Sequence, residues 1–318
     1  MEYKKKIIIL GSTAAFLALL YVLSILLDPA RSNARNERFT WLPAASRSEA
    51  DRIEINRGGE KLEMVLRNGS WFVLAASTEV PARQGRIDDL FRLLSTRGAF
   101  PRRGSNSGSH AELGLDGSTR LLVLGGAGLP LLDLIVGKED PSGTGVFLRK
   151  NGENEFRSGD KLIGSYVNGE KTAWYDLKLF EERSPAQVQR VQVHFSGYTG
   201  IDEESPVEYG DYTVTRSGED WVMSGSSLDR EKTETWIRGI LEAQGDDVLP
   251  ANDELGGLFQ AVAGIRVELG DGSVLEMQIE QAGEDGKSPT QVSGKPYRIV
   301  LSRWTLARLF REQGSFAK

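Results

Sequence analysis

RIEI at residues 52–55 decides the fold, because the chain repeats it as RVQV at residues 190–193. Further matched segments follow in the same order: GSWFV (69–73) with EDWVM (219–223), LFRLL (90–94) with WIRGI (236–240), ELGL (112–115) with ELGG (254–257), and Trp174 plus Leu179-Phe180 with Trp304 plus Leu309-Phe310. Matches that keep their order are typical of an internal repeat. The sequence therefore predicts that one unit was duplicated and fused, which favours binding or assembly over catalysis.

Alternating apolar and polar residues predict that each unit opens with a β-hairpin. Residues 53–66 alternate with the period of two that half-buried strands show, and WFVL at 71–74 is the returning strand. Asn68-Gly69 lies between them and is a strong hairpin-turn signal, because both residues tolerate positive φ. In the second unit the runs 265–269 and 274–279 flank Asp271-Gly272 and predict another hairpin.

A helix follows the first strands of each unit. Ile87, Leu90, Phe91 and Leu94 recur at helical spacing and predict a helix over about 86–96, with its counterpart over 230–243. Strand-like runs follow, and the short connections favour an antiparallel α+β fold over parallel βαβ windings. We expect a transmembrane anchor (1–28), a juxtamembrane linker (29–50) and two antiparallel β-rich α+β repeats (51–185 and 186–318).

The second unit carries an insertion that the first lacks. Twelve extra residues fall within Gly197 to Gly210, GYTGIDEESPVEYG, at a predicted hairpin tip where binding surface is often found. A solvated tip without a role is the alternative. The residues of the insertion that are candidates for partner contact are Tyr198, Asp202, Glu203, Glu204 and Tyr209. Its acidic run lacks the ligand spacing of a calcium loop.

The N-terminus predicts a retained membrane anchor. Ile7 to Leu27, IIILGSTAAFLALLYVLSILL, contains no charged residue and is long enough to cross a bilayer as a helix. Lys4, Lys5 and Lys6 precede it and favour a cytoplasmic N-terminus, with the bulk of the chain outside the inner membrane of a bacterium. A cleaved signal peptide is the alternative, although its apolar core would be unusually long.

Composition argues against several classes of function. The soluble part, residues 41–318, carries a net charge of −9, so it lacks the basic surface of a nucleic-acid-binding protein. The chain has no cysteine, which removes disulfides, thiol nucleophiles and cysteine-ligated metals.

No motif predicts a catalytic, cofactor or metal site. Gly125 to Gly128 lacks the Lys-Ser/Thr of a phosphate-binding loop and is better explained as a hairpin turn. The two histidines, His110 and His194, have no partners at metal-ligand spacing. Scattered carboxylates leave acid–base hydrolysis open.

The repeated tryptophans, at positions 71, 174, 221 and 304, lie within apolar runs. They are better explained as core residues than as a carbohydrate-stacking platform. Trp41 falls outside the repeat and is expected at the membrane surface or simply exposed.

A lysine-led span, strand pairs ending in a tryptophan strand, a helix, ELGL at 112–115 and Trp174-Tyr175 together resemble a bacterial family of unknown function. Members of that family are commonly encoded beside gliding-motility-type ABC-2 transporters. The resemblance implies a non-enzymatic extracytoplasmic accessory or scaffold subunit, held in the lipid bilayer by its N-terminal helix and bound to ABC transporter subunits. A periplasmic ligand- or polysaccharide-binding module is the alternative, and an envelope hydrolase is third.

Overall fold

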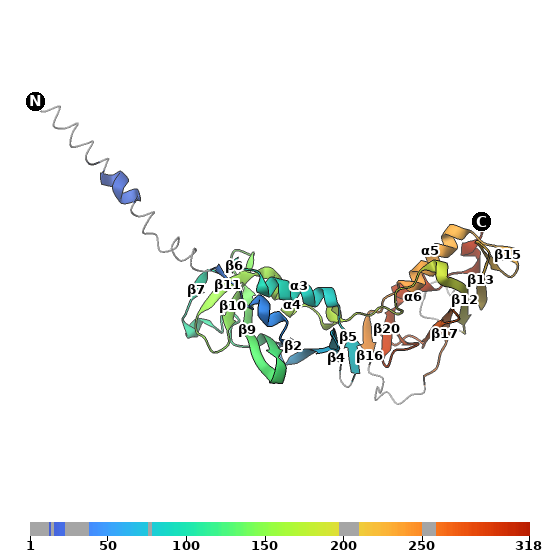
Figure 1. Cartoon of the computed structure of the whole chain (residues 1–318), viewed down its shortest axis with the longest axis horizontal. Coiled ribbons are helices and arrows are strands. Elements are labelled where there is room, and N and C mark those ends of the chain that lie inside the picture. The colour runs from blue at the N-terminus through green and yellow to red at the C-terminus, as the bar shows by residue number, and fades with distance from the viewer. Residues whose placement is uncertain (1–12, 14–15, 23–37, 76–77, 197–209, 250–258) are drawn as a thin grey trace, which may run out of the picture. The chain divides into compact units, whose positions relative to one another are not determined.

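The computed structural model describes residues 13, 16–22, 38–75, 78–196, 210–249 and 259–318. These residues form two nine-stranded antiparallel sheets, helices and one two-stranded pair (Figure 1). The expected antiparallel α+β class is therefore confirmed. The predicted anchor at 7–27 lies mostly outside the described residues, within which no helix is both long and apolar enough to cross a membrane.

The first sheet has the spatial order β5-β4-β3-β2-β8-β9-β10-β11-β7. Its strands are β2 (Ala50–Arg57), β3 (Glu60–Arg67), β4 (Ser70–Ala75), β5 (Thr78–Pro81), β7 (Arg102–Gly104), β8 (Thr119–Gly125), β9 (Leu129–Glu139), β10 (Gly145–Lys150) and β11 (Phe156–Asp160). Asn68 and Gly69, with φ of 50° and 84°, form the predicted turn between β3 and β4. Residues 126–128 form the turn between β8 and β9, as expected for Gly125 to Gly128.

The second sheet has the order β15-β14-β13-β12-β17-β18-β19-β20-β16. Its strands are β12 (Val188–Phe195), β13 (Tyr212–Ser217), β14 (Asp220–Met223), β15 (Ser226–Ser227), β16 (Asp247–Leu249), β17 (Ala263–Leu269), β18 (Val274–Ile279), β19 (Lys287–Val292) and β20 (Arg298–Ser302). The nine strands of each sheet correspond in chain order, from β2 with β12 to β11 with β20. Under this correspondence the two sheets have the same spatial order of strands. Both sheets therefore have one topology, as a duplication predicts.

The helices also correspond. α3 (Gln84–Ser95) buries the predicted stripe of Ile87, Leu90, Phe91 and Leu94, and α5 (Arg230–Leu241) occupies the same place in the second repeat. A second helix follows the last long strand in each repeat: α4 (Lys161–Asn168) after β11 and α6 (Arg303–Leu309) after β20. Asp160 and Ser302 cap these helices by accepting hydrogen bonds from backbone N–H groups of the first turn.

Equivalent tryptophans lie near the start of β4 and β14. Trp71 and Trp221 are the second residues of their strands and are 8% and 0% exposed. Each carbonyl accepts a hydrogen bond from the segment before the following helix, Trp71 from the N–H of Ala82 at 2.9 Å and Trp221 from the N–H of Leu228 at 2.8 Å. The predicted equivalence of these tryptophans is confirmed, as is their place in the core.

The proposed match of Trp174 with Trp304 is wrong. Trp174 ends the 3-10 helix η4 (Lys171–Trp174) and is fully buried, whereas Trp304 is the second residue of α6 and is 81% exposed. Phe316 is the counterpart of Trp174, because it ends η6 (Gln313–Phe316) and is 1% exposed. The counterpart of Trp304 is Leu162, the second residue of α4, which is also exposed.

The segment before the first sheet is packed against the first repeat. β1 (Arg38–Phe39) pairs with β6 (Gly98–Ala99), and the 3-10 helix η1 (Ala44–Arg47) follows. Trp41 is 4% exposed, with its ring 5.3 Å from that of Phe100, and Leu42 is fully buried. The expectation of an exposed or membrane-surface Trp41 is therefore wrong. Its ring packs in the core of the first repeat, although Trp41 itself lies outside the repeated sequence.

By internal contacts the described chain divides into two compact units. One contains residues up to 66 together with 84–169, and the other contains residues 67–83 and 170–318. Within the second unit, two backbone hydrogen bonds of 2.8 Å join Leu177 and Leu179 to the segment that follows α5. The carbonyl of Leu177 accepts from the N–H of Gly245, and the N–H of Leu179 donates to the carbonyl of Ala243. Leu177 and Leu179 thus pack as part of that unit's core.

Candidate functional site

The second sheet has one apolar face and one polar face. Val191, Val193 and Val214 are 2% exposed or less and alternate along β12 and β13 with polar residues. Strand alternation places these two sets on opposite sides of the sheet. The apolar face forms the core, where α5 packs against β14 and α6 against β20. We call the other side the outer face of the second sheet.

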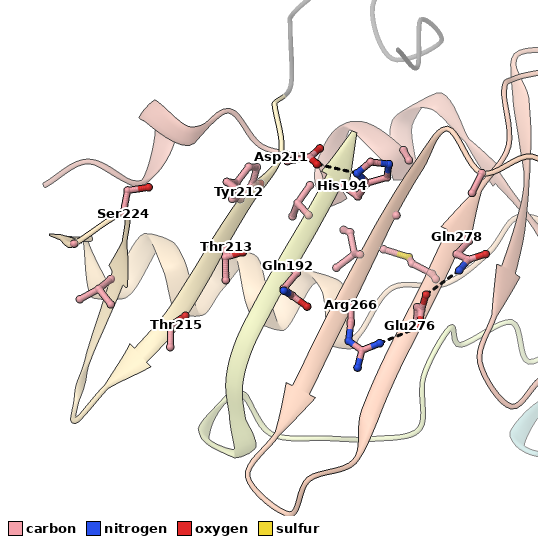
Figure 2. A pocket seen from close by; sticks show the side chains of 18 residues that line it. Gln192, His194, Asp211, Tyr212, Thr213, Thr215, Ser224, Arg266, Glu276 and Gln278 are labelled. Carbon is pink, nitrogen blue, oxygen red and sulfur yellow. Dashed lines mark hydrogen bonds and ion pairs between the residues drawn. The ribbon is translucent and has the colours of Figure 1, made fainter. Parts of the chain in front are cut away.

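A hollow of about 870 Å³ lies over this outer face. Figure 2 shows its labelled side chains, which come from neighbouring strands and from the turn after β14. The residues that line the hollow lie on or next to β14, β13, β12, β17 and β18, five strands that are adjacent in the sheet. The volume is within the range of small-molecule sites, roughly 300–1,000 Å³. The lining residues with polar side chains are Gln192, His194, Asp211, Tyr212, Thr213, Thr215, Ser224, Arg266, Glu276 and Gln278.

Uncharged hydrogen-bonding groups occupy the middle of the hollow. Gln192 of β12 faces Thr213 of β13 in the strand register, and Thr215 lies two residues further along β13. Within the described parts of the chain, the side chains of these three residues contact no hydrogen-bond partner. The amide offers donors and an acceptor, and each hydroxyl offers both functions. The central part of the hollow can therefore bind a polar ligand without first breaking protein hydrogen bonds.

Charged groups at both sides of the hollow are paired. On β17 and β18, Arg266 lies 3.6 Å from Glu276, which also accepts a 2.8 Å hydrogen bond from Gln278. At the other end, Nδ1 of His194 is 2.9 Å from Oδ2 of Asp211. The backbone N–H of Phe195 and the His194 ring hydrogen-bond this carboxylate, and both lower the pKa of Asp211. The Arg266 guanidinium thus has a carboxylate partner, and the Asp211 carboxylate already accepts two hydrogen bonds.

The corresponding face of the first sheet carries ions where the second carries neutral groups. Glu54 and Glu63 form the cross-strand pair that matches Gln192 and Thr213, and Nζ of Lys61 lies 3.0 Å from Glu54 and 2.9 Å from Glu63. Burial lowers the pKa of Lys61, but its hydrogen bonds to Glu63 and Glu54 outweigh that effect and raise it.

A second ion pair lies on the next two strands of the first sheet. Arg120 on β8 donates two hydrogen bonds of 2.6 Å to Asp133 on β9. Burial raises the pKa of Asp133, but the hydrogen bonds from Arg120 and Asn151 outweigh this effect and lower it. In the second sheet the register places Gly264 where the first has Arg120. The second sheet keeps an ion pair on these two strands, Arg266–Glu276, but lacks the long side chain at the position of Arg120.

The hollow provides groups for binding and no activated nucleophile. Among the described residues, no hydroxyl is hydrogen-bonded to His194, so the His194–Asp211 pair has no serine or threonine to deprotonate. No group of three or more metal-ligating side chains is found in that part of the chain either. The sequence-based expectations of no catalytic and no metal site stay predictions.

Most of the residues singled out in the sequence lie elsewhere. Nε2 of His110 lies 3.0 Å from the carbonyl oxygen of Asn154, which can accept its N–H, and the His110 ring meets that of Phe156 edge-on. Its role is packing in the first repeat. The anchor residues Ile7 and Leu27, with Lys4, Lys5 and Lys6, lie outside the described residues, as do Tyr198, Asp202, Glu203, Glu204 and Tyr209 of the insertion.

His194 is the one histidine that the structure places in the hollow. Sequence reasoning missed the other lining residues, although a signal was present. QVH at 192–194, TVT at 213–215 and EMQ at 276–278 each place polar residues two positions apart around a buried one. That alternation marks an outer face, but it cannot show which strands lie side by side.

Comparison with known proteins gives one family. The model of a family described as "Domain of unknown function (DUF4340)" matches residues 71–258, more than half of the chain. No curated protein and no solved structure matches the chain.

Proposed function

The chain belongs to the DUF4340 family, and from that premise we propose that it is a non-enzymatic accessory subunit that binds a membrane-protein partner. In this proposal residues 7–27 hold the chain in the inner membrane and the two repeats lie outside it. An ABC-2-type transporter is the partner class that the sequence resemblance implies. The chain carries no nucleotide-binding motif, so the ATPase would be a partner's.

The main support for the proposed partner contact is the exposure of Trp304. Its side chain is 81% exposed, although the other tryptophans of the repeats are buried. Trp is enriched among the residues that dominate protein–protein binding energies, because its large ring buries much area and its N–H can bind a partner. Leu162, at the same place in the first repeat, is 54% exposed. Each repeat thus presents an apolar side chain at the start of its second helix.

The N-terminal residues support the tether. Residues 16–22 are helical, and Phe16, Leu17, Leu19, Leu20, Tyr21 and Val22 are between 47% and 68% exposed. Such a run of exposed apolar side chains marks a membrane or protein contact. β1 begins at Arg38, with 15 residues between it and Val22. In this proposal the length of that segment limits how far the repeats can lie from the membrane.

Affinity purification of the full chain in mild detergent tests the proposal. We expect ABC transporter subunits to be recovered with the wild-type chain. Trp304→Ala should reduce that recovery at least tenfold, and Leu162→Ala should reduce it less. Leu129→Ala is the matched control, because Leu129 is 65% exposed but is the first residue of β9, away from the helices. Equal loss for Leu129→Ala and Trp304→Ala would show nonspecific adhesion and refute the specific contact.

A reporter fused after Lys318 tests the topology. We expect activity of an extracytoplasmic reporter and none of a cytoplasmic one. The reverse pattern would refute the location.

A further inference from the structure

We propose that the hollow on the outer face of the second sheet binds an uncharged polysaccharide strand. This inference goes beyond the proposed partner contact and does not depend on it. Four features of the hollow support it: its charge, the strands that form it, its length and its difference from the first repeat.

The charge of the lining favours a neutral ligand. Arg266 has carboxylate partners in Glu276 and, at 3.7 Å, in Glu268, so its guanidinium is already neutralised. At the other end, the carboxylate of Asp211 is occupied by the N–H of Phe195 and the ring of His194. A phosphate or uronate would have to displace one of these carboxylates from its partner. A neutral ligand meets no such competition.

The position of the hollow argues against an extended peptide. Peptides that bind to sheets add to an exposed edge strand, where free backbone groups give affinity. The hollow lies over inner strands such as β12 and β17, whose backbone groups are paired with neighbours on both sides. Recognition must therefore use side chains, and the side chains offered are amides, hydroxyls and the Arg266–Glu276 and His194–Asp211 pairs. This is the chemistry that vicinal hydroxyl groups of a sugar can match.

The length of the hollow fits a chain of sugars. It crosses five adjacent strands, from β14 to β18, and neighbouring strands lie about 4.8 Å apart, which gives a span of roughly 19 Å. Gln192 and Thr213 lie near its middle, and Gln278 lies at the β18 end. A monosaccharide would leave most of these groups without contact. An oligomeric ligand can use them all.

Gly264 keeps the β17 side of the hollow open. It lies opposite Gln278 in the strand register, at the place that Arg120 occupies in the first repeat. A Cβ atom there would come within 3.0 Å of the carbonyl oxygen of Met277. The absence of a side chain therefore both relieves the backbone and leaves room for a ligand.

The comparison between repeats supplies the decisive variant. Gln192→Glu, Asp211→Lys and Thr213→Glu together place on the second sheet the ion trio that Glu54, Lys61 and Glu63 form on the first. The reverse exchange, Glu54→Gln with Lys61→Asp and Glu63→Thr, is the matched control on a face outside the proposed site.

Calorimetry with the full chain in mild detergent tests the proposal, using a panel of neutral hexasaccharides that includes cellohexaose, maltohexaose and chitohexaose. Hexagalacturonate is the anionic probe. We expect at least one neutral hexasaccharide to bind, the triple variant of the second sheet to lose affinity at least tenfold, and the control variant to bind as the wild type does. Thr213→Val, which keeps the side-chain shape, should weaken binding in the same direction and carries the test if the triple variant fails to fold.

Several results would overturn the proposal. These are no binding by any neutral hexasaccharide, equal binding of hexagalacturonate, or undiminished binding by the folded triple variant and by Thr213→Val. Binding of an unfolded polypeptide such as carboxymethylated lactalbumin in the same hollow, without competition from the sugars, would assign it to peptides instead. The purification experiment measures a different property, so either proposal can fail alone.

Discussion

Replacing Phe316 with alanine tests the packing that completes the second repeat. Phe316 is 1% exposed, and its ring centroid lies 4.9 Å from that of Trp236 and 6.1 Å from that of Tyr212. Its carbonyl accepts a 2.9 Å hydrogen bond from the N–H of Asp229, directly before α5. The side chain therefore joins the C-terminus, α5 and β13 in one aromatic cluster.

The expected loss follows from burial and cavity formation. Removing a fully buried phenylalanine costs about 1.5–3 kcal/mol in transfer free energy, and the aromatic pairs add about 1 kcal/mol. Measured Phe→Ala changes in protein cores cost roughly 3–5 kcal/mol, so we expect Phe316→Ala to lower the free energy of unfolding by about 4 kcal/mol. Phe316→Leu retains much of the volume and should cost about 1.5 kcal/mol.

Urea unfolding of the full chain in mild detergent gives the free energies, and amide hydrogen exchange locates the loss. Exchange is needed because the two units need not unfold together. Protection should fall in α5 and β13 for Phe316→Ala. Trp174→Ala is the matched variant in the first repeat, where the carbonyl of Trp174 accepts from the N–H of Arg83 at 2.8 Å before α3. A Phe316→Ala loss under about 1 kcal/mol would refute the assigned packing.

Three further outcomes can be checked. Asp229→Ala removes the 2.9 Å cap on the N–H of Lys232 and should lower stability by about 1 kcal/mol in urea unfolding, a change that Asp229→Ser should largely avoid. Hydrogen bonds from the hydroxyls of Ser142 and Ser158 lower the pKa of Asp140 to about 2, so its stabilisation is complete above the ordinary carboxyl value and is lost as pH falls through about 2. Asp140→Asn should flatten that acid limb of the stability curve, and an unchanged limb would refute the assignment. Deleting residues 199–208 should leave the melting temperature nearly unchanged and weaken recovery of a membrane partner, and unchanged recovery would remove the insertion from the contact surface.

The sequence was sufficient to predict the strands and helices whose apolar residues recur with a clear period. The hairpin of β17 and β18 alternates cleanly, and its register pairs Ala263 with Ile279 as alternation requires. The helical stripe of α3 is buried as expected. These elements are predictable because their apolar spacing follows directly from strand and helix geometry.

β19, α4 and α6 were not predicted from the sequence, for local reasons. β19 contains Pro289, which argues against an inner strand because proline lacks an N–H. Pro289 lies just beyond Thr290, the last residue of β19 paired with β18, and its carbonyl accepts a 2.9 Å hydrogen bond from the N–H of Glu280, so proline costs the sheet a donor only where this pairing ends. α4 and α6 are too short for a clear helical period, at 8 and 7 residues. The Trp174–Trp304 match failed because it rested on identical residue type. Trp174 lies in η4, after the second helix of its repeat, whereas Trp304 lies within the second helix of the other repeat.

The hollow was beyond sequence reasoning for a topological reason. Its floor brings residues of β12 beside residues of β17, about 70 positions later in the chain. Single-strand patterns identify an outward face but do not order the strands. The repeat did carry usable information, since Glu54 and Glu63 became Gln192 and Thr213 while their buried neighbours stayed apolar.

This divergence yields a last prediction about the first sheet. Glu54→Gln with Glu63→Thr gives its outer face the neutral pair of the second sheet and leaves Lys61 without the Glu54 and Glu63 carboxylates. The side chain of Lys61 is 46% exposed, so the ammonium can be hydrated, and exposed ion pairs contribute about 0–1 kcal/mol. We expect a loss of stability below about 1 kcal/mol in urea unfolding, and a fall in the raised pKa of Lys61 that NMR titration can follow.

The double variant should not bind the neutral hexasaccharides, because the long side chain of Arg120 still occupies the position that Gly264 leaves open in the second sheet. A loss of more than about 2 kcal/mol would mean that the ion trio is needed for pairing of β2 with β3. In that case the change from Glu54 and Glu63 to Gln192 and Thr213 could not be explained as a substitution that an outer face tolerates without loss of stability. A small loss means that the core of a repeat fixes its fold while its outer face can change, which is the condition under which one copy can acquire a binding site.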